Sequence, residues 1–590
     1  VRTNGLDFLP NRLTIGQVAE MTVSTSNSNA SLGGGANQIS MVTPSGTNAI
    51  HGSLYWFNRN NAVAANDWFN NQSGVGIPRL NLNQLGGTVG GPLKRDKLFY
   101  YANYEAYRRR SQTPVLNTVL TPTARQGILR YRLADGSVQS FNVLANRQIA
   151  ANPLVARLLQ DVPMNGNTNQ AGDGLNTIGY NFNARSNIDR DFITGKGDYY
   201  LNAKNSFSSS YIWNRDRVDR PTLGSFYTVT PPTINDNSAH FWTAAWRSTV
   251  SATLTNELRG GFNRTKGPFV TSNPVPDLLL GGLLFTSPLN TKLPEGRDTS
   301  TYSIQDNANW IKGKHSLSFG YNGQYVRVPV YDFAGTVPTY NLGISGANQI
   351  GFAAGEIPGL PANFLPTANN LLANLGGIIT SGTRTFNPQN ATSGFVAGAP
   401  LTQNWGQNNH AFYVTDSWRL RPRLTLILGL RYDYWSVPDE KNSLQLQPVV
   451  QNNDGFGTLL SNATMDLHGY SVGRPLHRRD LNNWAPNIGF AWDVFGDGKT
   501  SLRGGYSIGF ANDNGGNSIF NTTNANFGLS SAVSFINSTA TLAAAPPLNA
   551  PAFRIPLTVR DAFVATGGNN TFVLVDPRLA MPYVQQYNLS

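Results

Sequence analysis

Three groups of residues in this sequence have the types that chemistry at a defined site requires. Gly86-Gly87-Thr88-Val89-Gly90-Gly91 has the glycine content of a phosphate-binding loop, but neither a helical pattern nor a Lys-Ser/Thr pair follows it. The run Asn512-Asp513-Asn514-Gly515-Gly516-Asn517 offers oxygen ligands for calcium, but it lacks the spacing and the final carboxylate of an EF-hand loop. Six histidines are candidate metal ligands, yet none has a metal-ligand spacing: His51, His240, His315, His410, His468 and His477.

Each of these groups has a structural interpretation that fits the sequence better. The glycine run is typical of a Gly-rich strand or turn, the acidic and amide run is typical of a loop turn, and the histidines are expected at scattered strand ends. Serines occur throughout the chain, so no serine, histidine and acid constellation can be singled out. The sequence therefore predicts no catalytic, cofactor-binding or metal site, and we expect that the protein is not an enzyme.

The composition narrows the class of protein further. The chain has 590 residues, no cysteine and 13% charged residues, with 11% aromatic residues and 59 glycines. Such usage favours strands and turns over helices and argues against a cytosolic enzyme. Lys and Arg number 45 against 33 Asp and Glu, a net charge of +12, but no polybasic run is present, so we expect no nucleic-acid partner.

The elements that must carry any site are strands. No stretch approaches the 18 or so consecutive apolar residues of a transmembrane helix. Instead, runs of about ten residues alternate between apolar and polar. In 424–434, the leucines and tyrosines fall on one face, while Arg431 and Asp433 fall on the other, where we expect them to face water. The same alternation places Asn322, Gln324 and Arg503 on a polar face.

Short and long connections alternate along the chain. Tight turns are expected at 94–97, 202–205, 312–314, 421–423 and 496–499. Between the hairpins lie long segments rich in Asn, Gly and Pro, at 61–82, 111–189, 218–239, 267–299, 331–407, 436–480 and 513–581. All short turns then fall on one side of a sheet of about fourteen strands, as in an outer-membrane β-barrel. A soluble propeller would repeat at roughly 40 to 50 residues, and no such period occurs.

The first 48 residues differ from the rest. Two short strands, at 17–23 and 37–43, are linked through Gly33-Gly34-Gly35. The stretch from Gly33 to Asn48, followed by His51-Gly52-Ser53-Leu54-Tyr55, resembles the junction between plug and barrel in TonB-dependent receptors of the Oar-like branch, with Pro44 in place of the usual lysine. The stretches 84–93, 96–100 and 103–105 are similar to the first barrel hairpin of that branch, and 582–590 resembles a late barrel strand.

The resemblance implies an all-β transmembrane barrel of about 22 strands with a plug in its lumen. It implies that 1–48 is the C-terminal half of the plug and that 49–590 is an incomplete barrel, with about eight strands beyond Ser590 and the TonB-contacting box before Val1. It also implies a location in the bacterial outer membrane, contact with outer-membrane lipid, and the TonB-ExbB-ExbD complex as the partner that supplies energy.

The function expected from this architecture is TonB-dependent import of a ligand, captured by long extracellular loops and gated by the plug. The Asn, Gly and aromatic content of the loops suits a glycan-like or peptide ligand, but no ligand-binding residue can be assigned. Two alternatives stay open. One is a surface or adhesion protein without transport, and the other is a secreted all-β glycan-active protein. Rings near strand ends, such as Tyr432, Tyr434, Tyr100 and Tyr104, suggest an aromatic girdle.

Overall fold

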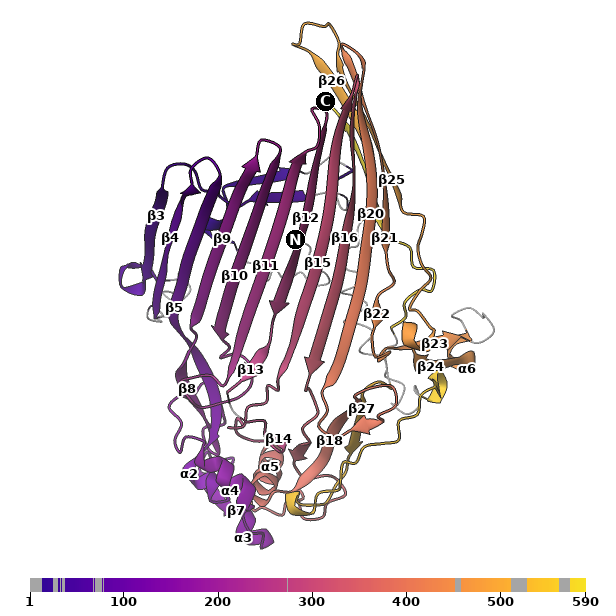
Figure 1. The fold of residues 1–590 in the computed structure, drawn as a ribbon. Coiled ribbons are helices and arrows are strands. Elements are labelled where there is room, and N and C mark those ends of the chain that lie inside the picture. Colours follow the sequence, from indigo (N-terminus) through magenta and orange to yellow (C-terminus); the bar gives the residue numbers. More distant parts are fainter. Residues whose placement is uncertain are drawn as a thin grey trace.

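The computed structural model describes residues 13–24, 30–31, 33, 38–66, 68, 77, 79–272, 274–450, 458–510, 528–561 and 573–590. The main element of this part of the chain is a barrel sheet of fourteen long antiparallel strands (Figure 1), which confirms the number expected from the alternation. The strands are β3 (His51–Asn60), β4 (Leu80–Lys94), β5 (Leu98–Leu120), β9 (Ile188–Asn202), β10 (Asn205–Asp219), β11 (Thr233–Thr249), β12 (Leu254–Lys266), β15 (Glu295–Lys312), β16 (His315–Asp332), β20 (Leu401–Arg421), β21 (Leu424–Trp435), β25 (Trp484–Asp493), β26 (Ser501–Phe510) and β29 (Tyr583–Leu589).

Each strand pairs with its neighbour in chain order, from β3 with β4 through β26 with β29. In the order of strands around the barrel, β29 is next to β3. The residue pairings among the described residues join β3 to β4 and β29 to β26. Leu54 in β3 is 92% exposed and Tyr587 in β29 is 73% exposed.

The predicted turns and loops take their expected places. The hairpins between β4 and β5, β9 and β10, β15 and β16, β20 and β21, and β25 and β26 are short, and all lie at one end of the sheet (Figure 1). A sixth short hairpin joins β11 to β12. Gly86–Gly91 lies inside β4, as the strand interpretation predicts, whereas the run 512–517 lies outside the described residues. No helix in the described part of the chain is long and apolar enough to span a membrane.

The faces of the strands follow the alternation, with one difference from the prediction. Leu428 and Leu430 are 44% and 40% exposed on the outer face of β21. Arg431 and Asp433 point to the inner face as expected, but they are buried rather than solvated, because they form an ion pair of 2.8 Å and Arg431 contacts the N-terminal segment. The pattern gives the face of a residue but not what covers that face.

The long connections are folded, which the sequence did not indicate. At the loop end of the sheet they form four helices, α2 (Pro122–Arg125), α3 (Val143–Arg147), α4 (Pro153–Gln160) and α5 (Leu365–Gly376). Short strands lie with them: β6 (Ile128–Arg132), β7 (Val138–Asn142), β14 (Leu279–Gly281), β17 (Thr339–Leu342), β18 (Ile379–Pro388), β19 (Phe395–Val396) and β27 (Ser531–Phe535). The strands β8 (Thr177–Arg185), β13 (Phe269–Thr271) and β22 (Asp439–Glu440) extend the barrel sheet.

These helices and short strands share one hydrophobic core, and we call them the loop cap. Its fully buried residues come from distant loops and include Leu120, Leu129, Val155, Leu371 and Ile379. A smaller core joins β23 (Leu446–Val450), β24 (Ala463–Leu467), β28 (Leu557–Thr558) and α6 (Leu459–Asn462). Among the described residues of the connections, single 3₁₀ turns occur at η2 (Asn61–Val63), η3 (Ala362–Phe364), η6 (Tyr470–Val472) and η8 (Leu542–Ala544).

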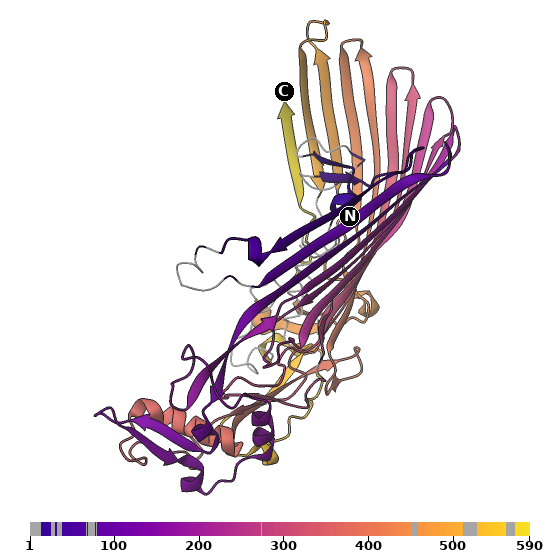
Figure 2. The same ribbon diagram turned by 90° about the vertical axis from the view of Figure 1, so that its left-hand side faces the viewer.

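The described part of the N-terminal segment holds the 3₁₀ turn η1 (Ile15–Gln17) and the strands β1 (Glu20–Ser24) and β2 (Gln38–Val42). The two strands pair with each other in an antiparallel register and belong to a separate two-stranded sheet. Figure 2 shows them on the concave side of the barrel sheet. The two predicted strands are therefore present, although the first begins three residues later than expected.

Candidate functional site: the contact between the N-terminal segment and the barrel wall

The N-terminal segment contacts the inner wall of the barrel at three places, and the first is at η1. The hydroxyl of Tyr101 in β5 donates to the carbonyl oxygen of Gly16 at 2.5 Å, and both residues are buried. A Cβ at Gly16 would overlap Asn103 and Thr88. The backbone of η1 therefore lies directly against β4 and β5, and glycine is required for that close approach.

The second contact lies on the opposite side of the segment. Arg431 in β21 donates from Nη1 to the carbonyl oxygen of Ala30 at 3.0 Å, while Asp433 holds the guanidinium from its other edge. Gly33 has a φ of 56° and packs so closely that a Cβ there would overlap the same guanidinium. Asn322 in β16 donates to the carbonyl oxygen of Ser31 at 3.2 Å. Together with Tyr101 at the first contact, Arg431 and Asn322 thus bind backbone carbonyls of the segment.

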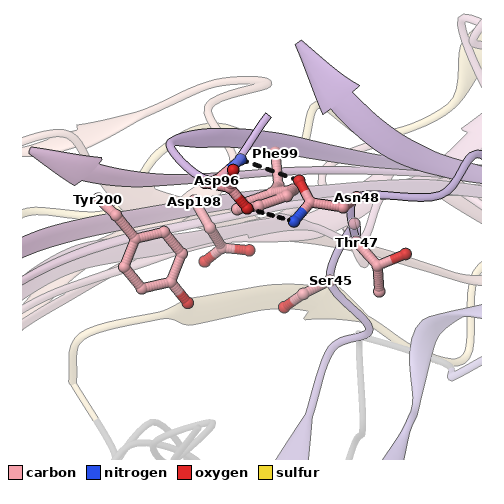
Figure 3. A pocket seen from close by; sticks show the side chains of 8 residues that line it. Ser45, Thr47, Asn48, Asp96, Phe99, Asp198 and Tyr200 are labelled. Carbon is pink, nitrogen blue, oxygen red and sulfur yellow. Dashed lines mark hydrogen bonds between the residues drawn. The ribbon is translucent and has the colours of Figure 1, made fainter. Parts of the chain in front are cut away.

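The third contact is the junction at which the segment enters β3. Lys196 in β9 donates to the carbonyl oxygen of Thr43 at 2.9 Å and to Oγ of Ser45 at 2.7 Å. Asn48 and Asp96 exchange two hydrogen bonds, from Nδ2 of Asn48 to Oδ1 of Asp96 at 2.6 Å and from the Asp96 amide to Oδ1 of Asn48 at 2.9 Å (Figure 3).

An open cavity lies beside this junction, at the short-turn end of the sheet. Its lining combines the segment with the turn between β4 and β5 and with β9: Ser45, Gly46, Thr47, Asn48, Asp96, Phe99, Asp198 and Tyr200 (Figure 3). Asp96 has a φ of 61°, in the left-handed region that few side chains adopt. The turn is thus held in the conformation that presents the Asp96 amide and carboxylate to Asn48.

The three contacts share a polar character. Five of their hydrogen bonds run from side chains of the wall to backbone or hydroxyl groups of the segment, and two more join Asn48 to Asp96. Each such bond contributes about 0.5–1.5 kcal/mol, or about 1.5–3 kcal/mol when one partner is charged. Polar groups can exchange these bonds for bonds to water, so the arrangement can hold a segment in the lumen and also release it.

Ionisable groups of the loops are buried at the other end of the barrel. Burial lowers the pKa of His468 and of His477, which overcomes the opposing effects of the backbone carbonyls of Asp466 and Arg478. Burial also raises the pKa of Glu440, although three backbone amides, from Asn404, Asn442 and Leu444, donate to its carboxylate. Burial thus shifts the pKa of each group in the direction that disfavours its charged form.

Several residues predicted from the sequence meet at this site and others do not. Arg431 and Asn322, expected on the lumen face, both contact the segment. Gln324 and Arg503, expected on the lumen face as further partners of the plug, stand on the inner face by the alternation of their strands, but neither side chain bonds the described part of the segment, and that of Arg503 donates to Ser501. Tyr101 and Lys196 were missed as contact residues. The alternation of their strands could have indicated them. Tyr101 and Lys196 stand on the inner face, whereas Tyr104 and Ile193, on the same two strands, stand on the outer face and are exposed.

The candidate ligands for a metal do not gather. No cluster of three or more His, Asp or Glu side chains able to hold a metal ion occurs in the part of the chain that the structure describes. His240 and His410 lie against tyrosines, with Nδ1 at 2.7 Å from the hydroxyls of Tyr211 and Tyr321, and His315 contacts Asp416 at 2.7 Å. The rings of Tyr432, Tyr434 and Tyr104 lie on the outer face, whereas Tyr101 and Trp435 lie inside and are buried.

Comparison with known proteins gives one match over nearly the whole chain. A family described as "Outer membrane beta barrel domain" matches residues 42–590. No curated protein matches the sequence. Among solved structures, the outer membrane transporter YddB from Escherichia coli is 13% identical, with a TM-score of 0.47, and the match covers 89% of this chain and 51% of that one.

Two further solved structures are similar at a comparable level. The siderophore receptor PirA from Acinetobacter baumannii is 12% identical with a TM-score of 0.42, covering 84% of this chain and 48% of that chain. A mutant of the ferric enterobactin receptor PfeA from Pseudomonas aeruginosa is 10% identical with a TM-score of 0.40, covering 84% and 50%. The chain spans about half the length of each of these three structures.

Proposed function

Because the chain belongs to the outer-membrane β-barrel domain family, we propose that it is part of a receptor that imports a ligand across the outer membrane, with residues 1–48 as part of a plug and 49–590 as barrel. The family consists of outer-membrane barrels rather than enzymes, and the protein is located in the outer membrane. The proposal concerns what passes through the barrel and what drives it.

One observation carries the proposal: a separate small sheet lies against the inner wall and is held there by polar contacts. A wide barrel without such a segment would be an open pore. The described part of the segment has an exposed apolar surface that includes Ile15, Met21 and Val23, so it does not bury a core by itself. Its order depends on the wall, as expected for a plug.

The energy for displacing the plug would come from the TonB-ExbB-ExbD complex, in keeping with the resemblance at 33–48. A pull applied from the N-terminal side of the segment would first strain the bond of Tyr101 to Gly16 and then that of Arg431 to Ala30. The junction at Lys196 and Asn48, where the chain passes from the segment to β3, would be strained last. Sequential loss of bonds of about 1 kcal/mol each requires far less force than simultaneous loss of a packed core.

The loop cap would form the capture surface for the ligand. It is built on its own core, so its outer residues are held in fixed relative positions, and a preorganised surface lowers the entropic cost of binding. A polar, glycan-like or peptide ligand would suit the Asn-rich and Gly-rich loops. A surface or adhesion role without transport is the alternative, and the same folded cap favours it.

Two measurements on the full chain separate these functions. First, deletion of 1–48 should raise single-channel conductance in planar bilayers containing potassium chloride. Unchanged conductance would mean that the segment is not a plug. Since the chain has no cysteine, a single Ser31→Cys variant can then be labelled in cells with a membrane-impermeant thiol reagent.

Labelling of Ser31→Cys reports whether the segment moves. Import predicts labelling in cells with TonB and an intact proton gradient, and protection in cells that lack TonB. A Ser251→Cys variant, in the turn between β11 and β12, is the matched control that should not respond to TonB. Equal labelling of Ser31→Cys with and without TonB would favour the adhesion alternative.

A further inference from the structure

Seven neighbouring strands, from β5 to β16, lie side by side in the barrel sheet (Figure 1), and a belt of charged side chains crosses their outer face. The registers assign it to the outer face, because its members alternate along each strand with inner-face residues and share their face with exposed apolar residues such as Tyr104, Ile193 and Trp242. We call it the outer belt. It comprises Arg108, Arg110, Asp189, Asp191, Arg215, Arg217, Asp236, Arg264, Lys266, Asp298 and Arg327.

The outer belt lies at one level of the barrel. Arg108, Arg215 and Arg264 each stand ten residues after the first residue of their strands, and Arg327 stands twelve after His315. A tilted transmembrane strand crosses the hydrocarbon core with about 9–11 residues. The belt is therefore one hydrocarbon thickness from the short turns, at the loop side of the membrane, where lipid headgroups begin.

The residues between the belt and the short turns confirm that level. On the outer face of β11, Trp246, Ala244, Trp242 and His240 follow one another from the turn toward the belt. Trp242 and Trp246 are 38% and 42% exposed. A ring of Tyr104, Trp213, His240 and Tyr325 lies just below the charges, as aromatic side chains do at a membrane interface.

The charges of the belt are ordered by ion pairs. Arg108 contacts Asp191 at 2.5 Å and Arg110 contacts Asp189 at 2.6 Å. On the next strands, Arg215 contacts Asp236 and Arg264 contacts Asp298, both at 2.6 Å, and Lys266 lies 3.8 Å from Asp298. These cationic side chains are 30–51% exposed, so their paired geometry is presented to the lipid.

The belt has a positive excess. It contains seven cations and four carboxylates, and the nearby pair Arg185 and Asp219 adds no net charge. Exposed ion pairs are each worth only about 0–1 kcal/mol, so an arginine can turn from a carboxylate to another anion at small cost. Its planar fork matches a phosphate with two parallel hydrogen bonds. The anions found at this level of a membrane are lipid phosphates.

We propose that the outer belt binds the phosphate groups of anionic lipids in the outer leaflet, with Arg108, Arg215 and Arg264 as the principal ligands. Outer-membrane barrels direct their short turns to the periplasm and their long loops outward, so the loop side is the outer leaflet. The carboxylates between the arginines keep the guanidinium groups apart and oriented. The site would fix the depth of the barrel and order the lipid around it.

The test measures lipid preference in reconstituted full-length chain. Tryptophans on the outer face, including Trp213, Trp242 and Trp246, are quenched by brominated lipids in vesicles of phosphatidylcholine mixed with brominated phosphatidylglycerol or, separately, brominated phosphatidylcholine. Since each cation near a membrane surface contributes about 1 kcal/mol of attraction to anionic lipid, we expect a preference for the anionic lipid of roughly five- to tenfold.

A matched pair of triple variants identifies the source of that preference. Arg108→Gln, Arg215→Gln and Arg264→Gln together should reduce it to less than about twofold. The control removes three inner-face arginines, Arg109→Gln, Arg247→Gln and Arg259→Gln, and should keep the preference of the unmodified protein. Equal loss in both triples would show a general charge effect and overturn the proposal, as would an unchanged preference in the outer triple.

Two further arms complete the test. If the outer triple does not fold, as judged by heat-dependent gel mobility, the single variants Arg264→Gln and Arg264→Lys replace it. Arg264→Gln should weaken the preference about twofold and Arg264→Lys should retain most of it. Inorganic phosphate at millimolar concentration should not displace the lipid. If it did, the belt would be a site for a soluble anion, and the assignment to lipid would be wrong.

Discussion

Adjacent alanines in β11 allow the assignment of the two faces to be tested with one substitution. Ala244 lies on the outer face, opposite Ser209 and Gly260 in the registers, and Ala245 lies on the inner face, opposite Ser208 and Arg259. Both are half-buried. Arginine at either position therefore adds the same side chain to the same strand at the same height. The two variants differ in the medium that receives the charge, and an arginine at position 245 also faces Arg259, whose charge Glu257 partly balances.

The expected cost follows from the position of Ala244. It stands five residues before the end of β11 at Thr249 and opposite Gly260, which is four residues below Arg264 in the outer belt. Four residues span roughly 13 Å, too far for an arginine to reach the headgroup level fully. Ala244→Arg should therefore lower the free energy of unfolding by about 2–4 kcal/mol, the range for a cation near the midplane. Ala245→Arg should cost less than about 1 kcal/mol.

Equilibrium unfolding in lipid vesicles, followed by tryptophan fluorescence, measures both free energies of unfolding. Ala244→Leu is the size control and should stay within about 1 kcal/mol of the unmodified protein. Equal costs for the two arginine variants, or a larger cost at Ala245, would refute the assignment of the faces. Leu428 is a poorer site for this test, because Asp416 lies opposite it on the same face and could pair with an introduced arginine.

Three other predictions concern the loops and the plug contact. Leu371 is fully buried in the loop cap, so Leu371→Ala should cost about 2–5 kcal/mol and expose α5 to protease while the strand signal of the barrel is retained. Tyr101→Phe removes the bond to Gly16, worth about 0.5–1.5 kcal/mol, and should increase thiol labelling of Ser31→Cys without changing the conductance of the 1–48 deletion. Since burial lowers the pKa of His468 and His477, the unfolded chain takes up protons first as the pH falls through about 6.5, and stability is lost in that window and below. Protease resistance of 458–480 should fall accordingly, and less in the double variant His468→Gln and His477→Gln. Glu440, with its raised pKa, acts in the opposite direction in both proteins.

The barrel strands could be predicted from the sequence because the pattern that specifies each strand lies within the strand and its adjoining turn. In β21, alternate residues differ in polarity over the whole strand, and a two-residue turn separates it from β20. Period and turn are both visible within about twenty residues. The face of Arg431 could be predicted for this reason. Its burial could not, because its partner Ala30 lies 401 residues away.

The loop cap could not be predicted for a related reason. Its core joins Leu129 and Leu158, from the segment 111–189, to Leu371, from the segment 331–407, and both segments contain many Asn, Gly and Pro residues. None of these segments has a long apolar period, since α4 has eight residues and α5 has twelve. A core assembled from several short segments leaves no local pattern in the sequence. Its leucines are nevertheless as fully buried as those in the core of an ordinary domain.

The outer belt occupies an intermediate position between these two cases. Parity gives the face of each arginine, and the distance from the preceding short turn gives its depth, and both quantities can be read from one hairpin. Arg108, Arg215 and Arg264 satisfy both conditions independently, each in its own hairpin. A charge that stands two residues nearer the midplane on the outer face lowers the stability of the barrel more. A charge at the same depth in three separate strands therefore indicates that this depth is a physical boundary. The agreement among hairpins therefore marks the boundary of the hydrocarbon layer on the loop side.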